Sequence, residues 1–354
     1  MSKLTNLRKV LNEEALDAIL ITSPINRRYL TNFTGTAGVA IISEEKAIFI
    51  TDFRYTEQAE EQIADFEIVE HTSLIHEEIH NQLKQHNIQK LGFEQSHVTF
   101  AQYTSFKKYF DGIELVPVSN IVENLRIIKS DEEIKIMEKA AEIADKAYEH
   151  ILSYIKPGVK EIDIANELEF YMRKLGATSS SFDIIVASGH RSALPHGVAS
   201  EKEITSGELV TMDFGALYEG YCSDITRTVA VGEINDQLRE IYDVVLKAQE
   251  LGVEGIKPGM TGVEADALTR DYITEKGYGK YFGHSTGHGL GMEVHEAPGL
   301  SFRSETTLLP GMVVTVEPGI YIPEVGGCRI EDDIVITDTG NKRLTKSDKE
   351  LIIL

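Results

Sequence analysis

The chain has 354 residues, which suits two domains better than one if a domain takes roughly 150 residues. Hydrophobic residues make up 42% and charged residues 26%, a composition typical of globular rather than disordered proteins. The 57 Asp and Glu residues outnumber the 35 Lys and Arg residues and give a formal charge of −22. Because such a surface repels nucleic acids and anionic membranes, we expect neither as a partner.

The cysteine content and the hydropathy of the chain favour a cytoplasmic protein. Two cysteines, Cys222 and Cys328, are too few for a disulfide framework in a chain of this length, and we expect both to be small buried side chains. The N-terminal residues place apolar side chains at helical spacing and lack the apolar core of a signal peptide. No run approaches about eighteen apolar residues, so we expect no membrane-spanning segment.

Short apolar runs alternate with helical patterns over the first third of the chain. This alternation is typical of an α/β domain. We expect strands at residues 18–21, 38–42, 47–51, 68–69, 91–93 and 115–118. We expect helices at residues 55–64, 74–85 and 100–109.

A capping box marks the start of a long helix after this region. Ser130 and Glu133 have the spacing at which each side chain caps the backbone N–H of the other. The apolar stripe behind them consists of Ile134, Met137, Ala141, Ala144 and Tyr148. We therefore place the domain boundary just before this helix, with one domain over residues 1–125 and the other over residues 126–354.

The second domain contains a weak internal repeat. IKPGV at residues 155–159 recurs as IKPGM at 256–260, and VTMDFG at 210–215 recurs as VTVEPG at 314–319. A third match sets Asp224 against Glu331. The offset between matches drifts, as expected when small insertions separate equivalent elements. The ordered series predicts two α/β halves related by pseudo-symmetry.

The repeat matches two pairs of acidic residues. Asp213 and Asp224 in the first half correspond to Glu317 and Glu331 in the second, and each lies in an otherwise apolar stretch. One such acid could face solvent at a sheet edge, but four matched acids indicate buried carboxylates, which need protons or cations. Two divalent ions would neutralise four carboxylates.

A histidine would complete this ligand set. The segment HSTGHGLGMEVH contains His284, His288 and His295. Oxygen-rich ligation with one imidazole favours manganese, cobalt or iron over a closed structural zinc site, which uses more Cys or His. We therefore expect a catalytic rather than a structural metal site.

The order Asp213, Asp224, His288, Glu317, Glu331 resembles the dinuclear site of the pita-bread metallopeptidases, the group of methionine aminopeptidase, aminopeptidase P and prolidase. The segments MDFGALYEGYCSDITRT, HSTGHGLGMEVHEAP, GMVVTVEPGIY and CRIEDDIVIT carry this resemblance over residues 126–354. SPINRRYLTNFTG and TDFRYTEQA are similar to the creatinase-like N-terminal α/β domain of the proline-specific branch. Creatinase shares the fold without metal, so the intact ligand set argues against a creatinase. Methionine aminopeptidases usually lack a first domain of this type, which favours the proline-specific branch.

The resemblance implies hydrolysis of Xaa–Pro bonds by a hydroxide that bridges two ions about 3.5 Å apart. Glu317 would take the proton of the attacking water and pass it to the leaving nitrogen. His196 and His295 match two family histidines that are not ligands and that stabilise the oxyanion or hold the substrate carbonyl. His284 matches a third, which lines the proline pocket.

Arg329 shares a strand face with Glu331 and is expected to reach the same cavity. It would orient a carboxylate, either a ligand's or the substrate's, or it would only pair with the acidic run at residues 331–333. Tyr321, four residues after Glu317, is a further candidate for substrate binding in the wall of this cavity. Asp332 and Asp333 are expected behind the ligands or in solvent.

A different metal-binding pattern lies in the first domain. HEEIH at residues 76–80 fits the H-E-x-x-H pattern of zinc peptidases on a predicted helix. The pattern lacks a third ligand, and the stripe of Ile75, Ile79 and Leu83 leaves His76 and His80 on an adjacent, wet face. We expect this match to be a coincidence.

Three functions remain open at this point. An Xaa-Pro dipeptidase (prolidase) is favoured by the chain length and the compact first domain, and an aminopeptidase P that acts on longer peptides is the alternative. An inactive binding protein on the same fold is more remote, since no ligand is missing. We expect two divalent ions per chain, manganese before cobalt or zinc, a homodimer, and peptide substrates with proline in second position.

Overall fold

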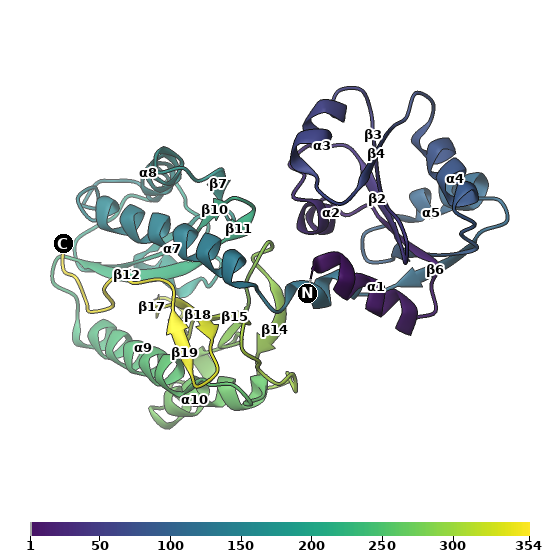
Figure 1. The fold of residues 1–354 in the computed structure, drawn as a ribbon. Helices are drawn as coiled ribbons and strands as arrows, with labels where there is room; N and C mark the ends of the chain where they lie inside the picture. Colours follow the sequence, from purple (N-terminus) through teal and green to yellow (C-terminus); the bar gives the residue numbers. More distant parts are fainter. Residues whose placement is uncertain (1) are drawn as a thin grey trace. The chain divides into compact units, whose positions relative to one another are not determined.

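A computed structural model describes residues 2–354 and divides the chain into two units, one that ends at Arg126 and one that begins at Ile127 (Figure 1). Each unit combines helices with sheets, as expected for the α/β class. Within the described residues, no helix is both long enough and apolar enough to cross a bilayer.

The first unit is built on a six-stranded mixed sheet. β1 pairs antiparallel with β2 and parallel with β5. The six predicted strands are confirmed, with ends that differ from the prediction by at most one residue. In spatial order they are β4 (Glu67–Glu70), β3 (Ala47–Thr51), β2 (Val39–Ser43), β1 (Ala18–Ile21), β5 (Lys90–Glu94) and β6 (Glu114–Val118).

The helices around this sheet include two that the sequence patterns did not indicate, α2 and α6. α2 buries polar residues such as Asn26 and Arg27, so it lacks an apolar period, and α6 has only six residues. The helix predicted at residues 100–109 is present with the predicted ends, and those predicted at 55–64 and 74–85 are present with ends shifted by one or two residues. The helices are α1 (Lys3–Glu13), α2 (Pro24–Thr31), α3 (Thr56–Gln62), α4 (Ile75–Gln85), α5 (Phe100–Tyr109) and α6 (Ile121–Arg126).

Two helix pairs enclose the strands of the second unit. α7 (Asp131–Ile151) packs on α8 (Glu161–Lys174), and α9 (Asp236–Gly255) packs on α10 (Gly262–Glu275). The strands lie between the α7–α8 pair and the α9–α10 pair (Figure 1). The capping box of Ser130 and Glu133 at the start of α7 is confirmed.

The strands of the second unit form two main sheets. The first sheet has the order β12 (Ile225–Val231), β9 (Glu208–Phe214), β8 (Ile185–Ser188). The second has the order β14 (Glu296–Leu300), β13 (Gly287–Gly289), β15 (Val313–Val316), β18 (Asp332–Ile336), β19 (Asn341–Arg343). Smaller sheets contain β7 (Ser179–Ser180), β10 (Ala216–Tyr218), β11 (Tyr221–Cys222), β16 (Gly319–Ile322) and β17 (Gly326–Arg329), and two short 3-10 turns span Gly189–Ala193 and Gly279–Tyr281.

The element order repeats between the two halves of this unit. A helix pair is followed in each half by an antiparallel strand pair, β9 with β12 and β15 with β18. The elements thus recur in the order that the sequence repeat indicates. The pseudo-symmetric α/β architecture is therefore confirmed.

Candidate metal centre

Strand alternation sends the acidic side chains away from the helix-covered cores. On β9, Val210, Met212 and Phe214 belong to the core against α7 and α8. Because successive strand residues point to opposite faces, Asp213 points away from that core. Glu317 directly follows Val316, which lies in the core of the other half.

The other two acids directly precede the partner strands. Asp224 comes before β12 and Glu331 before β18. Asp224, His288 and Glu331 each offer a ligand atom, and these atoms lie within 4.8 Å of one another. His288 Nε2 is 3.3 Å from Glu317 Oε1 and 3.9 Å from Asp224 Oδ2. Four of the five predicted ligands, from both halves, therefore converge on one point.

Burial makes the side chains of these acidic residues unusually weak acids. Burial and then the neighbouring carboxylates raise the pKa of Asp224 and of Glu331 well above their ordinary values. Burial, helped by Asp213 and opposed by Arg329, raises the pKa of Glu317 to about 8. Buried carboxylates that share a site cannot all be charged without a cation.

Two carboxylate oxygens in this cluster lack a partner among the described residues. Asp213 Oδ1 and Asp224 Oδ1 are buried and accept no hydrogen bond. A buried oxygen of this kind is costly unless a proton or a cation satisfies it. The donor set of four carboxylates and one imidazole, with its free oxygens, fits divalent metal ions.

Arg329 orients one of these carboxylates. Its guanidinium is buried and donates through Nη2 to Asp213 Oδ2 at 2.5 Å. It also donates through Nη1 to the Tyr321 hydroxyl at 2.7 Å and through Nε to Thr226 Oγ1 at 3.1 Å. Of the alternatives that the sequence left open, the structure shows Arg329 on the carboxylate of a predicted ligand.

The expectation that Asp332 and Asp333 could lie in solvent is wrong. Both are fully buried. Asp332 pairs with Arg227 Nη2 at 2.8 Å and with Lys349 Nζ at 3.0 Å. Asp333 Oδ2 accepts a hydrogen bond from the backbone N–H of Asp224 at 2.9 Å. Asp333 therefore supports Asp224 from behind.

His284 has both ring nitrogens occupied by the protein. Nδ1 lies 2.8 Å from the Ser285 carbonyl, which can only accept, so Nδ1 carries the proton. Nε2 then accepts from the Tyr321 hydroxyl at 2.8 Å. Burial and then the charge of Arg329 lower the pKa of His284 to about 4. This imidazole is neutral at physiological pH.

A cavity of about 570 Å³ surrounds the cluster. The His295 ring lies 4.3 Å from the His288 ring, centroid to centroid, and burial followed by the charge of His288 lowers the pKa of His295. Tyr321 is not among the lining residues that the structure describes and stands behind His284. The lining contains nine of the predicted site residues: His196, Asp213, Asp224, His284, His288, His295, Glu317, Arg329 and Glu331.

Two threonines support the ligands and were not predicted. Thr226 Oγ1 donates to Glu331 Oε2 at 2.6 Å. Thr315 Oγ1 donates to Glu317 Oε1 at 3.2 Å and accepts from the His288 backbone N–H at 3.0 Å. The sequence did contain a signal for both threonines. Thr226 lies two residues after Asp224 and Thr315 two residues before Glu317, and positions i and i+2 of a strand share a face.

The H-E-x-x-H histidines pack on aromatic rings in the first unit. The His76 ring stacks on Tyr109 with 5.2 Å between centroids, and the His80 ring is parallel to Phe110 at 6.5 Å. Both histidines are half-buried, so the expected wet face is wrong. The metal-type cluster that the structure shows among its described residues lies in the second unit.

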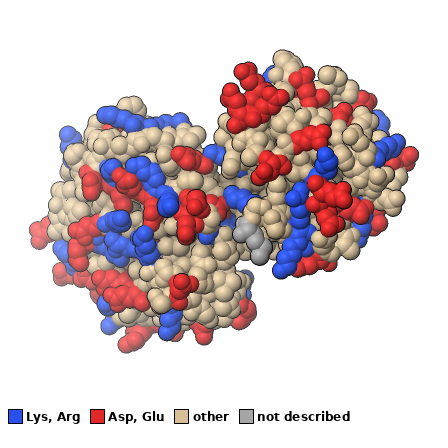
Figure 2. Space-filling view, in the orientation of Figure 1, with Lys and Arg blue, Asp and Glu red and all other residues tan. Residues whose placement is uncertain are grey.

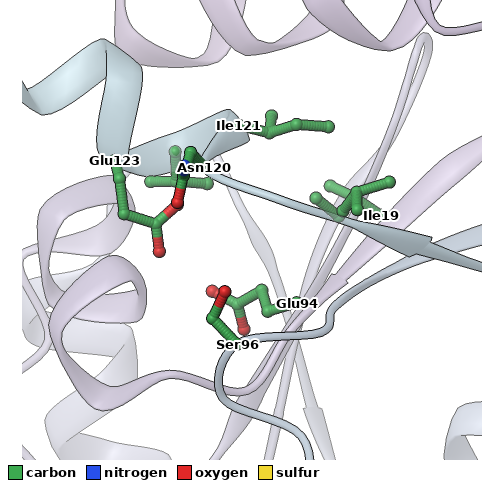
Figure 3. A pocket seen from close by; sticks show the side chains of 8 residues that line it. Ile19, Glu94, Ser96, Asn120, Ile121 and Glu123 are labelled. Atoms are coloured by element: carbon green, nitrogen blue, oxygen red, sulfur yellow. The ribbon is translucent and has the colours of Figure 1, made fainter.

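A small cavity in the first unit is taken up by the chain's own contacts. It has room for about one water and is lined by residues that include Glu94, Asn120 and Glu123 (Figure 3). Glu94 accepts from the backbone N–H of Thr22 at 2.6 Å and of Ser23 at 2.8 Å. Glu94 therefore anchors the turn between β1 and α2.

Comparison with known proteins gives two family matches. The model of the creatinase/prolidase N-terminal domain matches residues 3–128, and that of metallopeptidase family M24 matches residues 135–338. An Xaa-Pro dipeptidase of Pyrococcus furiosus is 45% identical over 99% of both chains.

Two solved structures share the whole fold. An Xaa-Pro dipeptidase from Bacillus anthracis is 65% identical over 99% of both chains, with a TM-score of 0.98. An X-Pro aminopeptidase from Thermotoga maritima is 39% identical over 96% of this chain and 98% of that one, with a TM-score of 0.92. With the M24 match spanning more than half of its length, this chain belongs to metallopeptidase family M24, a family of metal-dependent hydrolases, and carries a creatinase/prolidase-type N-terminal domain.

Proposed function

We propose that the protein is an Xaa-Pro dipeptidase. The observation that carries this proposal is the cluster of Asp224, His288 and Glu331, with both carboxylates buried, in a cavity of an M24 peptidase. The 65% and 45% identical relatives named Xaa-Pro dipeptidase support the substrate class. The proposed ligands of two divalent ions are Asp213, Asp224, His288, Glu317 and Glu331.

The proposed chemistry assigns proton transfer to Glu317. Two divalent ions would polarise the scissile carbonyl and acidify the attacking water. Glu317, in the charged form that cations at the site favour, takes the proton of that water. It then delivers the proton to the prolyl nitrogen, which has no hydrogen of its own in an Xaa–Pro bond and must be protonated to leave.

His196 and His295 are proposed as donors to the substrate carbonyl oxygen. Both line the cavity beside the ligand cluster. Each imidazole can donate an N–H, and donors fixed in a dry cavity stabilise the oxyanion of the tetrahedral intermediate. His284 cannot share this task because both of its nitrogens are engaged, so it acts as a wall against the proline ring together with Phe182 and Val198.

We propose manganese as the preferred metal, with cobalt or zinc as the alternatives. Four carboxylates and one imidazole suit manganese better than zinc, which prefers nitrogen and sulfur. Stripping the metal with a chelator and restoring Mn²⁺, Co²⁺ or Zn²⁺ in turn tests this, with turnover of Ala-Pro as the measurement. The highest kcat/KM is expected with Mn²⁺.

One observation favours the aminopeptidase as the second candidate. The described residues that line the cavity include one guanidinium, that of Arg329, and no lysine. Arg329 is already bound to Asp213, so the free carboxylate of a dipeptide meets imidazoles instead of a cation. The 39% identical relative is named an X-Pro aminopeptidase.

Cleavage of Ala-Pro, Ala-Pro-amide and Ala-Pro-Ala by the manganese-loaded enzyme separates the two candidates. A dipeptidase cleaves Ala-Pro with the highest kcat/KM and loses most of it with the amide. Equal or faster cleavage of Ala-Pro-Ala would assign the aminopeptidase instead. Cleavage of none of the three, with any of the metals, would reject the peptidase proposal.

We also propose a cytoplasmic homodimer. Both cysteines are buried and unpaired, and burial raises the pKa of the Cys222 and Cys328 thiols to about 12. Unpaired thiols suit a reducing compartment. The family resemblance supports the dimer, and light scattering of the metal-loaded protein at micromolar concentration measures it.

A further inference from the structure

Side chains of helix α10 bind the backbone of the segment that carries His284 and His288. Asp266 and Arg270 lie one helical turn apart on α10 and form a two-point ion pair, Nε to Oδ2 at 2.5 Å and Nη2 to Oδ1 at 2.8 Å. Asp266 is 1% exposed. Neither residue lines the metal-centre cavity. The pair thus acts on the site only through the backbone that it holds.

Arg270 binds the backbone on the substrate side of this segment. Its Nη2 donates to the His284 carbonyl at 2.7 Å and its Nη1 to the Phe282 carbonyl at 3.1 Å. The guanidinium also lies 4.3 Å from the centre of the Phe282 ring. Because Asp266 fixes the guanidinium fork, the two carbonyls are held in one arrangement, and with them the position of the His284 imidazole.

Asp266 binds the backbone on the metal side. Its Oδ1 accepts from the Thr286 backbone N–H at 2.9 Å. The Thr286 carbonyl accepts from the backbone N–H of Glu317 at 2.7 Å. The Asp266 carboxylate therefore fixes the position of the backbone between His284 and His288. Through Thr286 it also fixes the position of the Glu317 backbone.

A stability role alone explains this arrangement poorly. Burying the Asp266 carboxylate costs desolvation, and replacing a charged pair with a buried member by apolar residues is often neutral or stabilising. What an apolar pair could not do is fix two carbonyls and one N–H at set positions. Some buried polar groups orient the residues that bind the metal or the substrate. Mutation of such a group commonly lowers the affinity for the metal or the activity, although the group itself contacts neither.

We propose that Asp266 and Arg270 are positioning residues for the reaction, Arg270 through His284 and Asp266 through the backbone between His284 and His288. The inference rests on the proposed function, because it takes the roles of both histidines from it. Removal of Arg270 then weakens substrate binding, and removal of the Asp266 charge weakens metal binding.

The test compares Arg270→Met, Arg270→Lys and Asp266→Asn with Arg173→Met as the matched control. Arg173 forms an equivalent i, i+4 pair with Glu169 on α8, but its side chain is 54% exposed. For each variant we measure KM and kcat for Ala-Pro, Mn²⁺ affinity of the metal-stripped protein by calorimetry, and the melting temperature.

Arg270→Met is expected to raise KM about tenfold with kcat changed less than about threefold, since small shifts of a positioning group are costly. Arg270→Lys restores part of the loss because an ammonium can still reach the His284 carbonyl. Asp266→Asn is expected to weaken Mn²⁺ binding about tenfold. Arg173→Met changes neither KM nor metal affinity.

Folded variants with wild-type KM and wild-type Mn²⁺ affinity would overturn the proposal, whatever their melting temperatures. Should Arg270→Met fail to fold, the KM of Arg270→Lys decides, and a value within twofold of wild type rejects the role of Arg270. If the wild-type enzyme cleaves no Xaa–Pro substrate, the proposed function fails. The calorimetry of Asp266→Asn then still reports on the positioning of the metal ligands.

Discussion

Glu317 is subject to opposing influences that decide its protonation. Burial and the charge of Asp213 raise its pKa to about 8, while Arg329 acts in the other direction. In the metal-free protein Glu317 therefore holds its proton at neutral pH. Cations at the site favour the charged form. Glu317 can thus serve both as a proposed ligand and as a proposed base only when the site is loaded.

Glu317→Gln tests both roles at nearly constant shape. The amide cannot accept the proton of water, so kcat for Ala-Pro is expected to fall at least about 10³-fold. Loss of one charge from the cluster is expected to weaken Mn²⁺ binding, measured by calorimetry. Circular dichroism provides the folding control. Wild-type turnover in a folded Glu317→Gln variant would remove Glu317 from the mechanism.

His76→Ala and His80→Ala test the coincidental zinc pattern. Their rings stack on Tyr109 and Phe110, and the proposed site belongs to the second unit. We expect kcat/KM within about twofold of wild type and a stability loss of about 1 kcal/mol from each lost ring contact. Metal analysis is expected to give an unchanged number of ions per chain. A large loss of activity together with one ion would establish a site at these histidines.

At the scale of elements, the sequence predicted best where an element has a clear apolar pattern. Ala18–Ile21 and Ala47–Thr51 were predicted with their observed ends because they are continuous apolar runs. α2 was missed because it buries Asn26, whose amide donates to Glu94 and Glu123. A helix stabilised by polar contacts to distant residues leaves no periodic signal.

In the candidate site, the metal-ligand candidates were predictable from the sequence, but the contacts between side chains of separate elements were not. The repeat matched Asp213 with Glu317 and Asp224 with Glu331, and their apolar surroundings predicted that these carboxylates are buried. The partners of Arg329 could not be read from the chain, because the β16–β17 hairpin brings it to Tyr321 and packing alone brings it to Asp213. Contacts between side chains of separate elements depend on tertiary packing that local patterns do not encode.

The capping box of α7 offers a test at this scale. Ser130 Oγ accepts from the Glu133 N–H, and Glu133 Oε2 accepts from the Ser130 N–H. Ser130→Ala removes the first of these bonds and is expected to cost about 1 kcal/mol of unfolding free energy, measured by urea denaturation followed by helical circular dichroism.

Thr261→Ala is the matched variant, since Thr261 and Glu264 form the same box on α10. Activity per folded molecule is expected to stay within about twofold for Ser130→Ala. A neutral effect of Ser130→Ala on unfolding would mean that tertiary packing alone defines the start of α7.

At the scale of the whole molecule, the charge of −22 has two components. On the face drawn in Figure 2, acidic side chains gather in groups on each unit, with Lys and Arg between them. The other component is buried, in Asp224, Glu331 and their neighbours. Surface charge is screened by water and salt, whereas the buried carboxylates tie the stability of the fold to protons and metal.

Below roughly pH 6.5 the buried histidines favour the fold as pH rises, because burial lowers the folded pKa of His284 to about 4 and also lowers that of His295. The loss of stability from the buried carboxylates is therefore expected in the metal-stripped protein as pH rises from about 7 to 8. Glu317 has a folded pKa of about 8 against roughly 4.3 for an unfolded Glu, so the folded state binds more protons across this window. Asp224 and Glu331 are shifted in the same direction. An acid with a raised folded pKa stabilises the fold below its unfolded pKa, and that stabilisation is lost as pH rises through the folded value. Salt-bridged surface acids do not interfere, because the pKa of Asp52 and of Glu142 is lowered to about 2 by hydrogen bonds to basic neighbours, and their contribution changes only in more acidic solution.

Bound Mn²⁺ reverses this dependence, because the cations replace the protons and bind the folded state alone. Calorimetric melting of the protein in chelator and in excess Mn²⁺ at pH 5, 6, 7 and 8 measures both curves. The difference between the two melting temperatures is expected to grow with pH, and Glu317→Gln is expected to flatten the chelator curve, since its amide does not titrate. A stripped protein whose melting temperature rises from pH 7 to 8, above the range in which the histidines titrate, would show that the cluster ionises without metal, and the assignment of the four carboxylates to a cation site would fail with it.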